Sequence, residues 1–491
     1  MSPRPTPQKR RAARTRNATR PLAVVVLAAG AGKRMRSRKA KVLHEVAGRT
    51  MLDHVLDAVD RLAPQRTVVV VGHCGDQVAT KISGRGECVT QSEQLGTGHA
   101  VSQAKRELRG FVGDVLVLCG DVPLITSGTL RRLVATHRRR SAAATVLGMV
   151  LDDPTGYGRI LVEGREAVRI VEHPDATDEE RLIDEVNTGT YCFDSGFLFR
   201  SLGRLGRDNA QGEYYLPDLL AVASRDGRAA KMTLEDAAEG LGVNSRADLA
   251  NAEMVMQDRL LVYWMDRGVT FLDPATAYLS AAAKLGRDTV IGPNVRIEGA
   301  TTIGEDCVFD GSSYLRDTRV ESGVHVRWGV VTQDAQIGRG VRIGPYAHLR
   351  PEASLAPEVH IGNFVEVKKS RIGRGSKANH LAYIGDATVG ENANIGAGTI
   401  TCNYDGFNKY RTTIGDRVQI GSDTQLVAPV SLGDDCYVAA GSTITRNVEA
   451  GALVYNDKRQ MVRTNWVADF RERSTRRKQR RGAGDKRKDE Q

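Results

Sequence analysis

Two patterns of hydrophobic and polar residues divide the chain. Between residues 22 and about 244, short apolar runs alternate with segments in which apolar residues recur at helical spacing. The apolar runs include 23–27, 67–71 and 115–119, and the helical segments include 51–61 and 130–139. Continuous apolar strands are typical of a sheet that helices cover on both faces. This region is therefore predicted to be a mostly parallel, Rossmann-like α/β sheet, with its ligand at the carboxyl ends of the strands.

From about residue 285 to 445, the apolar residues follow a six-residue period instead. The longest uninterrupted run is Ile414, Ile420, Leu426, Leu432, Val438 and Ile444. A hexapeptide period predicts a parallel β-helix, in which one apolar side chain of each short strand points to the axis. The period fails between Ile400 and Ile414, which predicts an external loop. Such loops often lie on the binding face of a solenoid.

One long helix is predicted between the two patterns, at 245–268. Ser245 and Asp248 form a capping box, and Gly268 is a suitable C-terminal stop. The apolar residues form one stripe, made of Leu249, Ala252, Met256, Leu260 and Tyr263. A helix of about 22 residues is about 33 Å long. We interpret this helix as a rigid connector, and its methionines as packing residues.

The composition is that of a soluble globular protein, with 491 residues, 41% hydrophobic and 26% charged. The net charge of +11 is concentrated at the ends of the chain. Residues 1–20 carry seven basic side chains and no acidic one, and residues 471–491 carry ten basic and four acidic ones. The body between them is close to neutral. Such tails are usually disordered and solvated, although a loose grip on nucleic acid or an anionic membrane is the alternative.

The cysteines and the hydropathy indicate a cytoplasmic protein. The seven cysteines are scattered and never form a CxxC pair, as expected of reduced thiols. No apolar run approaches the length of about 18–20 residues that a membrane span needs. The apolar run at 22–31 follows basic residues as in a signal peptide. We reject that interpretation because the same run is the first predicted strand.

Two motifs of the first region suggest phosphate chemistry. Residues 27–35 form a glycine loop after a strand, with Lys33 and Arg34 beside it. Arg34 stands where a Walker loop has Ser or Thr, so the loop is not a P-loop, but its free N–H groups suit a nucleoside triphosphate. The alternative is a plain strand–helix connection. Asp121 follows another buried strand and could hold Mg²⁺ against phosphates, or merely cap the next helix.

Taken together, the motifs resemble those of one bacterial enzyme family. They lie at 27–35, 39–44, 91–100, 120–124, 154–160, 171–177, 186–191, 209–220 and 242–244. The family is the bifunctional N-acetylglucosamine-1-phosphate uridylyltransferase/glucosamine-1-phosphate N-acetyltransferase, whose second domain is a left-handed parallel β-helix. The resemblance covers about residues 22–460. It implies a basic disordered tail at 1–21, a nucleotidyltransferase domain at 22–244, a linker helix at 245–268, an acetyltransferase β-helix at 269–460 and a basic tail at 461–491.

The resemblance implies roles for residues of the first domain. Those that would border or read the uridine nucleotide are Leu27, Ala28, Ala29, Gly30, Gln91, Gly96 and Thr97. Arg34 and Lys41 would neutralise phosphate charge as catalytic cations, and Asp121 and Asn244 would hold Mg²⁺. Those that would line the N-acetylglucosamine 1-phosphate side are Cys119, Gly120, Gly158, Glu172 and Asn187, with Thr188 assisting. Cys119 stands where the family usually has Tyr, which would reshape that side slightly.

The resemblance implies a second site in the β-helix. A lone histidine on a solenoid is more often structural, but the family makes His380 the general base, and imidazole titrates near neutral pH. The sugar phosphate would be bound by Arg350, Lys368, Tyr383, Asn394, Asn403 and Tyr404, near Lys409. Acetyl-CoA would be bordered by Ala397, Asn403, Tyr404, Ser422 and Ala440. Lys458 or Arg459 would supply a further cation for the coenzyme, and Asn379 replaces a common Gly.

The implied function is a two-step synthesis of UDP-N-acetylglucosamine for peptidoglycan and lipopolysaccharide precursors. Glucosamine 1-phosphate would be acetylated by acetyl-CoA, and the product would take UMP from UTP with release of pyrophosphate. The implied cofactor is Mg²⁺, and the assembly a homotrimer that requires no nucleic acid or membrane partner. Two alternatives remain: a nucleotidyltransferase whose β-helix only oligomerises, and a non-enzymatic scaffold or RNA-binding protein driven by the tails.

Overall fold

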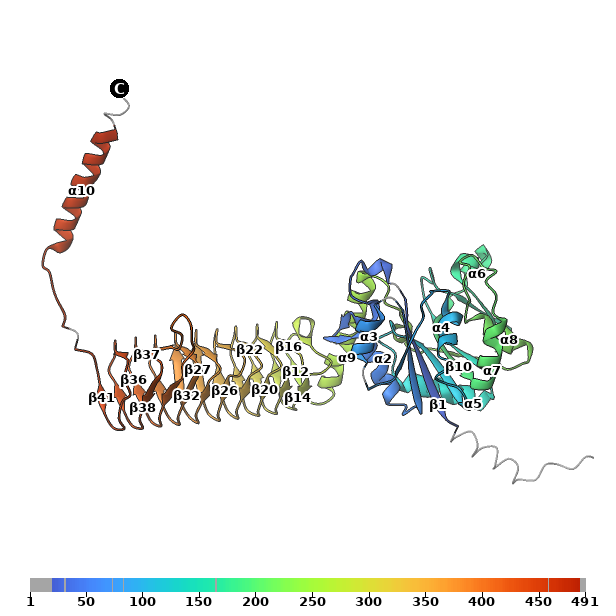
Figure 1. Ribbon diagram of the computed structural model, residues 1–491, viewed down its shortest axis with the longest axis horizontal. Helices are drawn as coiled ribbons and strands as arrows, with labels where there is room; N and C mark the ends of the chain where they lie inside the picture. The colour runs from blue at the N-terminus through green and yellow to red at the C-terminus, as the bar shows by residue number, and fades with distance from the viewer. Residues whose placement is uncertain are drawn as a thin grey trace, which may run out of the picture. The chain divides into compact units, whose positions relative to one another are not determined.

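A computed structural model describes residues 20–485, except 31, 73, 83, 164–165 and 458. The predicted N-terminal tail up to residue 19 and the candidate cation Lys458 lie outside these residues. The chain divides into two compact units, Met1–Pro351 and Glu352–Gln491 (Figure 1). Within the described ranges, no helix combines the length and apolar character needed to cross a membrane.

The first unit begins with a mixed sheet. Its strand order is β11-β7-β10-β6-β1-β4-β5, with the hairpin β8–β9 attached to β10. The strands are β1 (Leu22–Ala28), β4 (Arg66–Val71), β5 (Glu87–Thr90), β6 (Asp114–Cys119), β7 (Ala144–Val150), β8 (Arg159–Glu163), β9 (Glu166–Val171), β10 (Glu185–Asp194) and β11 (Ala229–Thr233). The central strand β1 is parallel to β4 and β6, and β10 is antiparallel to β6 and β7. The predicted strands and their mostly parallel pairing are confirmed.

Helices cover both faces of this sheet, as the unbroken apolar strands predicted. The helices are α2 (Met51–Asp60), α3 (Gly75–Lys81), α4 (Thr97–Gln103), α5 (Ser127–Arg140), α6 (Asp178–Arg181), α7 (Ser195–Ser201) and α8 (Asp218–Arg225), with 3-10 turns η1 (Lys33–Met35), η2 (Lys41–Leu43), η3 (His173–Asp175), η4 (Leu202–Arg204) and η5 (Ala237–Gly240). One core lies between the sheet and α4, α7 and α8. The other lies between the sheet and α2, α3 and α5 (Figure 1). Side chains alternate along β1, so Val25 enters the first core and Val24 and Val26 the second.

The predicted long helix is α9 (Arg246–Met265). Its capping box is present, because the Ser245 side chain accepts from Asp248 N–H and the Asp248 side chain accepts from the Ser245 N–H. Gly268 ends the turn after it at φ +85°, a left-handed conformation that favours glycine. The helix is shorter than predicted. Its apolar stripe is only partly buried, since Ala252 is 5% exposed and Tyr263 is 46% exposed.

Helix α9 is fixed to the segments on either side of it. Glu253 accepts a 2.7 Å hydrogen bond from the Ala47 N–H, in the hairpin β2 (Glu45–Val46)–β3 (Arg49–Thr50). Gln257 bonds the N–H and the carbonyl of Leu279 in the first coils of the β-helix, at 2.9 and 2.8 Å. Both ends of an amide side chain are thus satisfied, which holds the helix against the coil.

The rest of the first unit consists of β-helix coils. The strands are β12 (Thr270–Phe271), β13 (Tyr278–Leu279), β14 (Lys284–Leu285), β15 (Val290–Ile291), β16 (Arg296–Glu298), β17 (Thr302–Ile303), β18 (Val308–Phe309), β19 (Tyr314–Arg316), β20 (Arg319–Val320), β21 (His325–Val326), β22 (Val331–Gln333), β23 (Gln336–Ile337), β24 (Arg342–Ile343) and β25 (His348–Leu349), with the turn η6 (Pro274–Thr276). Every third strand pairs in parallel, so Val290 lies beside Val308 and Arg296 beside Tyr314. This is the parallel β-helix that the period predicted, and the family resemblance implied its left-handed form.

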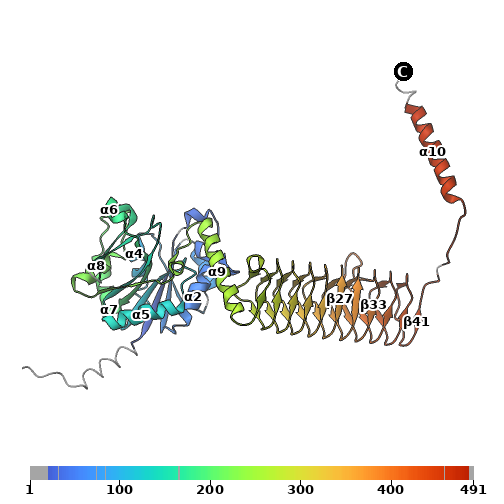
Figure 2. The ribbon, with the colours of Figure 1, turned by 180° about the vertical axis from the view of Figure 1, so that it is seen from behind.

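The second unit repeats the same coil. Its strands are β26 (Ser354–Leu355), β27 (His360–Asn363), β28 (Glu366–Lys368), β29 (Arg371–Ile372), β30 (Lys377–His380), β31 (Tyr383–Gly385), β32 (Ala387–Val389), β33 (Asn394–Ile395), β34 (Ile400–Cys402), β35 (Thr412–Ile414), β36 (Gln419–Ile420), β37 (Gln425–Val427), β38 (Val430–Leu432), β39 (Tyr437–Val438), β40 (Thr443–Ile444) and β41 (Leu453–Val454). All six residues of the predicted run from Ile414 to Ile444 are at most 3% exposed. The predicted external loop leaves the coil between β34 and β35 (Figure 2), and Phe407 within it is 92% exposed.

The basic C-terminal segment is helical where the prediction was a disordered, solvated tail. Residues 466–485 form the helix α10 (Trp466–Asp485), supported by an Arg476–Glu472 pair one turn apart. Its arginines have a good helix propensity even though they make it strongly polar. Arg20, assigned to the disordered N-terminal tail, belongs to the folded body instead. It pairs with the fully buried Asp114 at 2.9 Å and also with Asp194.

Candidate active sites

A cavity of about 260 Å³ lies at the carboxyl ends of β1 and β6. Ten residues predicted for the uridylyltransferase site line it together, namely Leu27, Ala28, Ala29, Gly30, Lys41, Gln91, Gly96, Thr97, Cys119 and Asp121. They come from four separate segments of the chain. The position agrees with the rule that ligands of parallel sheets lie at the carboxyl ends of the strands.

The base side of this cavity is held by backbone and amide contacts. Gln91 is 4% exposed and donates from Nε2 to the Gly96 carbonyl at 3.2 Å. Gly96 has φ +102°, and a Cβ there would lie 2.8 Å from the Tyr214 carbonyl oxygen, so only glycine fits. The Thr97 hydroxyl accepts from the Leu216 N–H at 3.0 Å. A flat ring entering here would meet a fixed amide and fixed backbone groups.

The sequence predictions missed two polar residues that line the cavity. Gln94 donates from Nε2 to the Ala29 carbonyl at 2.8 Å, closing the glycine loop from the opposite side. Glu213 lies against Gly96, and burial raises the pKa of its carboxyl. Both residues lie in motifs on which the resemblance rests, at 91–100 and 209–220. Membership of these motifs could have identified them as site residues.

Lys41 joins the two residues predicted to hold a metal. Its ammonium forms an ion pair with Asp121 and donates to Asn244 Oδ1 at 3.1 Å, across 203 residues of sequence. Asp121 and Asn244 thus present a carboxylate and an amide oxygen to one cation. The Val243 N–H also bonds the Asp121 carbonyl at 2.9 Å, which ties the two segments together.

This pair of oxygen ligands fits Mg²⁺, which usually takes one or two carboxylates and completes its shell with substrate phosphates and water. Among the residues that the structure describes, no group of three or more His, Cys, Asp and Glu side chains could hold a metal ion. A cation between Asp121 and Asn244 would therefore depend on oxygen atoms of the substrates. Arg34, the other predicted cation, lies exposed on η1 and is not among the residues that line the cavity.

The predicted sugar residues form a second cluster beside the first. The Asn187 N–H donates to the Gly158 carbonyl at 2.8 Å, and Asn187 Oδ1 accepts from the Gly189 N–H at 2.9 Å. A Cβ on Gly158 would lie 3.0 Å from Glu172 Oε1, so the carboxylate lies against bare backbone. Burial raises the pKa of Glu172 to about 7, and the charges of Asp175, Asp218 and Glu213 add to the shift.

Cys119 links the two clusters. Its thiol donates to the Gly189 carbonyl at 3.6 Å, on the strand that carries Asn187. Burial, and secondarily the charge of Asp121, raises the pKa of this thiol to about 12, so it remains neutral. Gly120 donates its N–H to the Leu27 carbonyl at 2.9 Å. The hydroxyl of Thr188 donates to the Leu147 carbonyl at 2.8 Å, which makes it a structural contact of β10.

In the second unit, His380 is held by a residue that the sequence predictions missed. His380 Nδ1 lies 2.7 Å from Asn363 Oδ1, and the two residues are register partners in β30 and β27. An amide oxygen can only accept, so Nδ1 carries the proton and Nε2 has a free lone pair. The histidine side chain is exposed. It is therefore oriented with its basic nitrogen available.

A cationic cluster lies on the same unit. Lys368 Nζ is 3.5 Å from Asp386 Oδ2, and the Asn403 amide donates to the same carboxylate. Lys409, in the external loop, lies near Lys368, which is the main cause of its lowered pKa. The ammonium groups of Lys368 and Lys409 and the carboxylate of Asp386 together leave a net positive charge, which suits a sugar phosphate. Asp386 is the member that the predictions did not name.

The other predicted acetyl-transfer residues lie at repeated positions of the coil. Ala397, Ser422 and Ala440 form a column, because Asp423 N–H bonds the Ala397 carbonyl at 2.7 Å and Gly441 N–H bonds the Ser422 carbonyl at 2.8 Å. Asn394 pairs in register with Gln419, one coil on. The Tyr383 side chain folds over Gly385, because a Cβ on Gly385 would be 2.4 Å from the Tyr383 hydroxyl.

The remaining candidate residues for acetyl transfer lie in the external loop, at the end of the first unit and near the C-terminus. Tyr404 is 59% exposed, pairs with Lys409 across the loop and donates its hydroxyl hydrogen to the Gly406 carbonyl at 2.5 Å. Arg350 follows β25 at the end of the first unit, and its role remains a prediction. Arg459 is exposed. The buried side-chain oxygen of Asn379 has no hydrogen-bond partner among the described residues.

Comparisons with known proteins agree with both halves of the chain. The family of MobA-like NTP transferase domains matches residues 24–180, and the bacterial transferase hexapeptide family matches 334–369 and 411–446. The chain is 50% identical over 445 residues to the Bifunctional protein GlmU of Heliobacterium modesticaldum, covering 90% of this chain and 97% of that protein. It is 47% identical over 449 residues to the Bifunctional protein GlmU of Pelobacter propionicus, covering 91% and 98%. A putative glucose-1-phosphate thymidylyltransferase from Bacillus anthracis matches 48% of the chain at 19% identity, with a TM-score of 0.39.

Proposed function

The chain belongs to the bifunctional GlmU family, and from that premise we propose how its residues carry out the two reactions. It acetylates glucosamine 1-phosphate with acetyl-CoA, and it transfers UMP from UTP to N-acetylglucosamine 1-phosphate with release of pyrophosphate. The product, UDP-N-acetylglucosamine, is a precursor of the cell wall. The observation that carries the proposal is the Lys41 ammonium, which joins Asp121 to Asn244 beside a cavity lined by the predicted nucleotide residues.

In uridylyl transfer, a phosphate oxygen of the sugar 1-phosphate attacks the α-phosphorus of UTP in line with the leaving pyrophosphate. One P–O bond forms and one breaks. The attacking oxygen is already anionic, so the reaction needs positioning and charge neutralisation more than a base. Lys41 supplies a positive charge next to Asp121, and Arg34, which is exposed on η1, supplies a second positive charge to the phosphates. Mg²⁺ held by Asp121 and Asn244 would neutralise phosphate charge and polarise the phosphorus.

The sugar of the acceptor binds to the second cluster. Glu172 and Asn187 face a strip of bare backbone at Gly158 and Gly189, where hydroxyl and acetamido groups can approach closely. The Glu172 carboxyl group forms hydrogen bonds with sugar hydroxyls. Cys119, being neutral, adds no charge between the nucleotide and the sugar.

In acetyl transfer, the amine of glucosamine 1-phosphate attacks the thioester carbonyl of acetyl-CoA. His380 Nε2 accepts the proton that the amine loses, and Asn363 keeps the imidazole in the tautomer that can do so. The C–N bond forms as the C–S bond breaks, and the leaving thiolate takes up the proton from His380, so that the coenzyme leaves as its thiol. Lys368, Lys409 and Arg350 bind the 1-phosphate, and Tyr383, Asn394, Asn403 and Tyr404 position the sugar. Acetyl-CoA lies along the column of Ala397, Ser422 and Ala440.

We extend the proposal to the surroundings of the enzyme. Its metal is Mg²⁺, its assembly is a homotrimer built on the β-helix, and it works in the cytoplasm without a nucleic acid or membrane partner. The hexapeptide coil supports the trimer, and the free cysteines support the cytoplasmic location. The domain limits at 22–244, 245–268 and 269–460 belong to the same proposal.

Mass spectrometry of the products tests the function. The full chain is incubated with Mg²⁺, UTP, acetyl-CoA and glucosamine 1-phosphate, and UDP-N-acetylglucosamine is expected. Without acetyl-CoA no nucleotide sugar should form, but supplied N-acetylglucosamine 1-phosphate should restore it. If product forms from supplied N-acetylglucosamine 1-phosphate but not from glucosamine 1-phosphate with acetyl-CoA, the chain is a nucleotidyltransferase with a silent β-helix. No turnover in any mixture would indicate a scaffold.

A further inference from the structure

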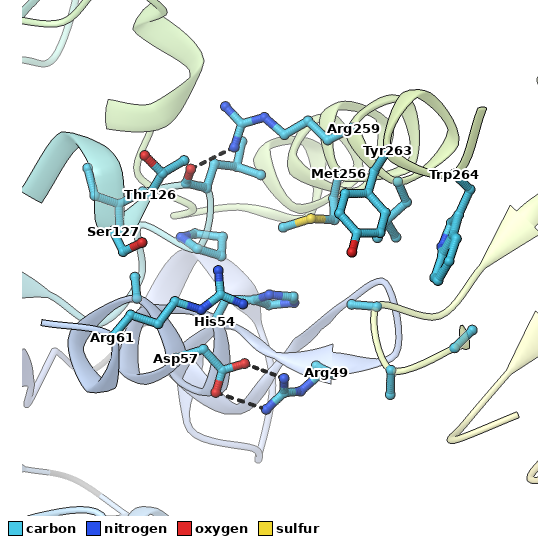
Figure 3. A pocket seen from close by; sticks show the side chains of 18 of the residues that line it. Arg49, His54, Asp57, Arg61, Thr126, Ser127, Met256, Arg259, Tyr263 and Trp264 are labelled. Atoms are coloured by element: carbon cyan, nitrogen blue, oxygen red, sulfur yellow. Dashed lines mark hydrogen bonds and ion pairs between the residues drawn. The ribbon is translucent and has the colours of Figure 1, made fainter. Parts of the chain in front are cut away.

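The first unit contains a second and larger cavity, of about 830 Å³, away from both sites described above. Four segments line it: residues 49–61 with β3 and α2, residues 123–127 between β6 and α5, α9, and residues 281–284. Figure 3 shows Tyr263 and Met256 on α9 facing His54 on α2 and Arg61 just after it across the space, with Thr126 and Ser127 at one end.

The walls of this cavity combine an apolar surface with an excess of positive charge. Its charged side chains are Arg49, Asp57, Arg61, Arg259 and Lys284. Two of the cations are already paired. Arg49 bonds Asp57 (Figure 3). Arg259 bonds Asp236 at 2.8 Å and the Leu124 carbonyl at 2.7 Å. Asp57 is also bonded by Arg85 at 2.7 Å. The single carboxylate in the walls is therefore fully used by guanidinium groups.

The other two cations are unused. No hydrogen bond or ion pair involves the side chain of Arg61 or of Lys284 anywhere in the described parts of the chain. The hydroxyl of Tyr263 has no described partner either, although Arg267 stacks on its ring at 3.5 Å. His54 Nε2 donates to the Val46 carbonyl at 2.8 Å, and burial lowers the pKa of this imidazole, so the ring remains neutral. The cavity thus offers two free cations and neutral polar groups above an apolar floor.

The floor is continuous with the segments that hold Asp121 and Asn244. Leu124 and Met256 line the cavity and also pack in a small core cluster with Val243, the residue before Asn244. Leu124 itself is three residues after Asp121, whose carbonyl accepts from the Val243 N–H at 2.9 Å. The walls of the cavity thus contact, through this cluster, the segments that carry Asp121 and Asn244.

We propose that this cavity binds a small anionic molecule with a flat apolar body, and that its occupancy is coupled to nucleotide binding at Asp121. The apolar body packs between Pro123, Leu260 and the aromatic residues Tyr263 and Trp264. The anionic group pairs with Arg61 and Lys284. The binding claim stands independently of the enzyme's activity, and the coupling claim rests on the proposed nucleotide site.

Calorimetric titration with matched probes tests the binding claim on the full chain. The probes are 2-naphthalenesulfonate, the neutral 2-naphthalenemethanol and inorganic phosphate. We expect the sulfonate to bind about tenfold more tightly than the neutral compound, because two partly exposed ion pairs contribute about that much together. Phosphate alone should bind weakly, because it lacks the apolar body. Equal binding of the sulfonate and the neutral compound would overturn the charge assignment.

Variants locate the site. Arg61→Gln with Lys284→Gln should remove the advantage of the sulfonate without changing the binding of the neutral compound. Both side chains are exposed, so folding should be retained. Arg140→Gln with Arg225→Gln removes the same charge from exposed positions that do not line the cavity and should have no effect. A loss of sulfonate binding in this control would show a general charge effect and overturn the site.

The coupling claim is tested without turnover. The affinity for UTP is measured with the cavity empty and saturated with 2-naphthalenesulfonate, and the affinity for the sulfonate is measured with and without UTP. We expect a change of about fivefold that is equal in the two directions, as linkage requires. Unchanged UTP affinity under saturating sulfonate would overturn the coupling. Failure of UTP to bind at all would instead refute the proposed nucleotide site.

Discussion

The two catalytic regions of this chain assemble their sites in opposite ways. The cavity of the α/β region collects side chains from segments between residues 27 and 244, which meet only because the parallel strands end at one edge. The β-helix collects its residues from neighbouring coils, so that Asn363 meets His380 through one step of register. The α/β site depends on the whole fold, because its residues come from distant segments. The β-helix site depends on the pairing of neighbouring coils. Substitutions should therefore act locally in the β-helix and more broadly in the α/β region.

The largest effect is expected from His380→Ala. The amine must lose a proton as it attacks the thioester, and a general base typically contributes about 10²–10⁴-fold. Acetyl transfer should fall by that factor, while uridylyl transfer from supplied N-acetylglucosamine 1-phosphate continues at the wild-type rate. Both rates are measured by product mass spectrometry. Retention of more than about a tenth of the acetyl-transfer rate would show that the substrate amine enters neutral and needs no base.

Glu172→Gln tests whether the negative charge of the Glu172 carboxylate destabilises the α/β fold. The Glu172 carboxyl has a pKa of about 7 in the folded chain, above its ordinary 4.5. Between those values the folded chain retains a proton that the unfolded chain has lost, so stability falls as pH rises through this range. Above pH 7 the penalty is complete. The variant should gain about 3 kcal/mol of unfolding free energy at pH 8 and almost nothing at pH 4.

Urea unfolding at both pH values checks this difference. Glu87→Gln, at an exposed position, is the matched control and should show no such pH dependence. A gain of the same size at pH 4 and pH 8 would mean that the ionisation of Glu172 carries no penalty.

Asn363→Ala tests whether register pairing orients the base. Without the amide oxygen, the imidazole can adopt the other tautomer or turn away, and acetyl transfer should fall about tenfold in kcat with little change in KM. Asn363→Asp should restore most of the rate and move the pH profile of kcat to higher pH, because a carboxylate stabilises the protonated ring. A rate unaffected by Asn363→Ala, or a pH profile unmoved by Asn363→Asp, would exclude the positioning role.

The smallest effect is expected at the N-terminal edge of the α/β region. Removal of residues 1–19 should leave both activities and the stability unchanged, because the catalytic residues lie in the body of the chain. Arg20→Gln should lower the unfolding free energy by about 1 kcal/mol, since it removes one partner of the buried Asp114 and leaves Arg138 at 2.6 Å. Denaturant unfolding measures both. Equal stability of Arg20→Gln and the wild type would place Arg20 with the tail.

The repeated pattern made much of the fold predictable. Each apolar residue of the run from Ile414 to Ile444 is buried because a six-residue period has only one way to pack around an axis. Asp121 and the glycine loop were also predictable, because both follow buried strands whose ends meet at one edge of the sheet. In these cases one local pattern determines the position of the residue.

Contacts across coils and loops were not predictable from local patterns. The pairing of Asn363 with His380 requires the register of two coils, and that of Asp386 with Lys368 and Asn403 requires the fold of the external loop. The helix α10 was missed because its many arginines resemble a solvated tail, although arginine is also a good helix former. Arg20 was assigned to the tail because its partners Asp114 and Asp194 are distant in sequence.

The central claim, two independent sites in one chain, is tested most directly by Asp121→Ala. This residue pairs with Lys41 at the nucleotide cavity and has no counterpart in the β-helix. In one reaction with all substrates, mass spectrometry should detect N-acetylglucosamine 1-phosphate accumulating at the wild-type rate and no UDP-N-acetylglucosamine, because the metal has lost its anionic ligand. Equal loss of both products, in a variant that unfolds like the wild type, would contradict the account.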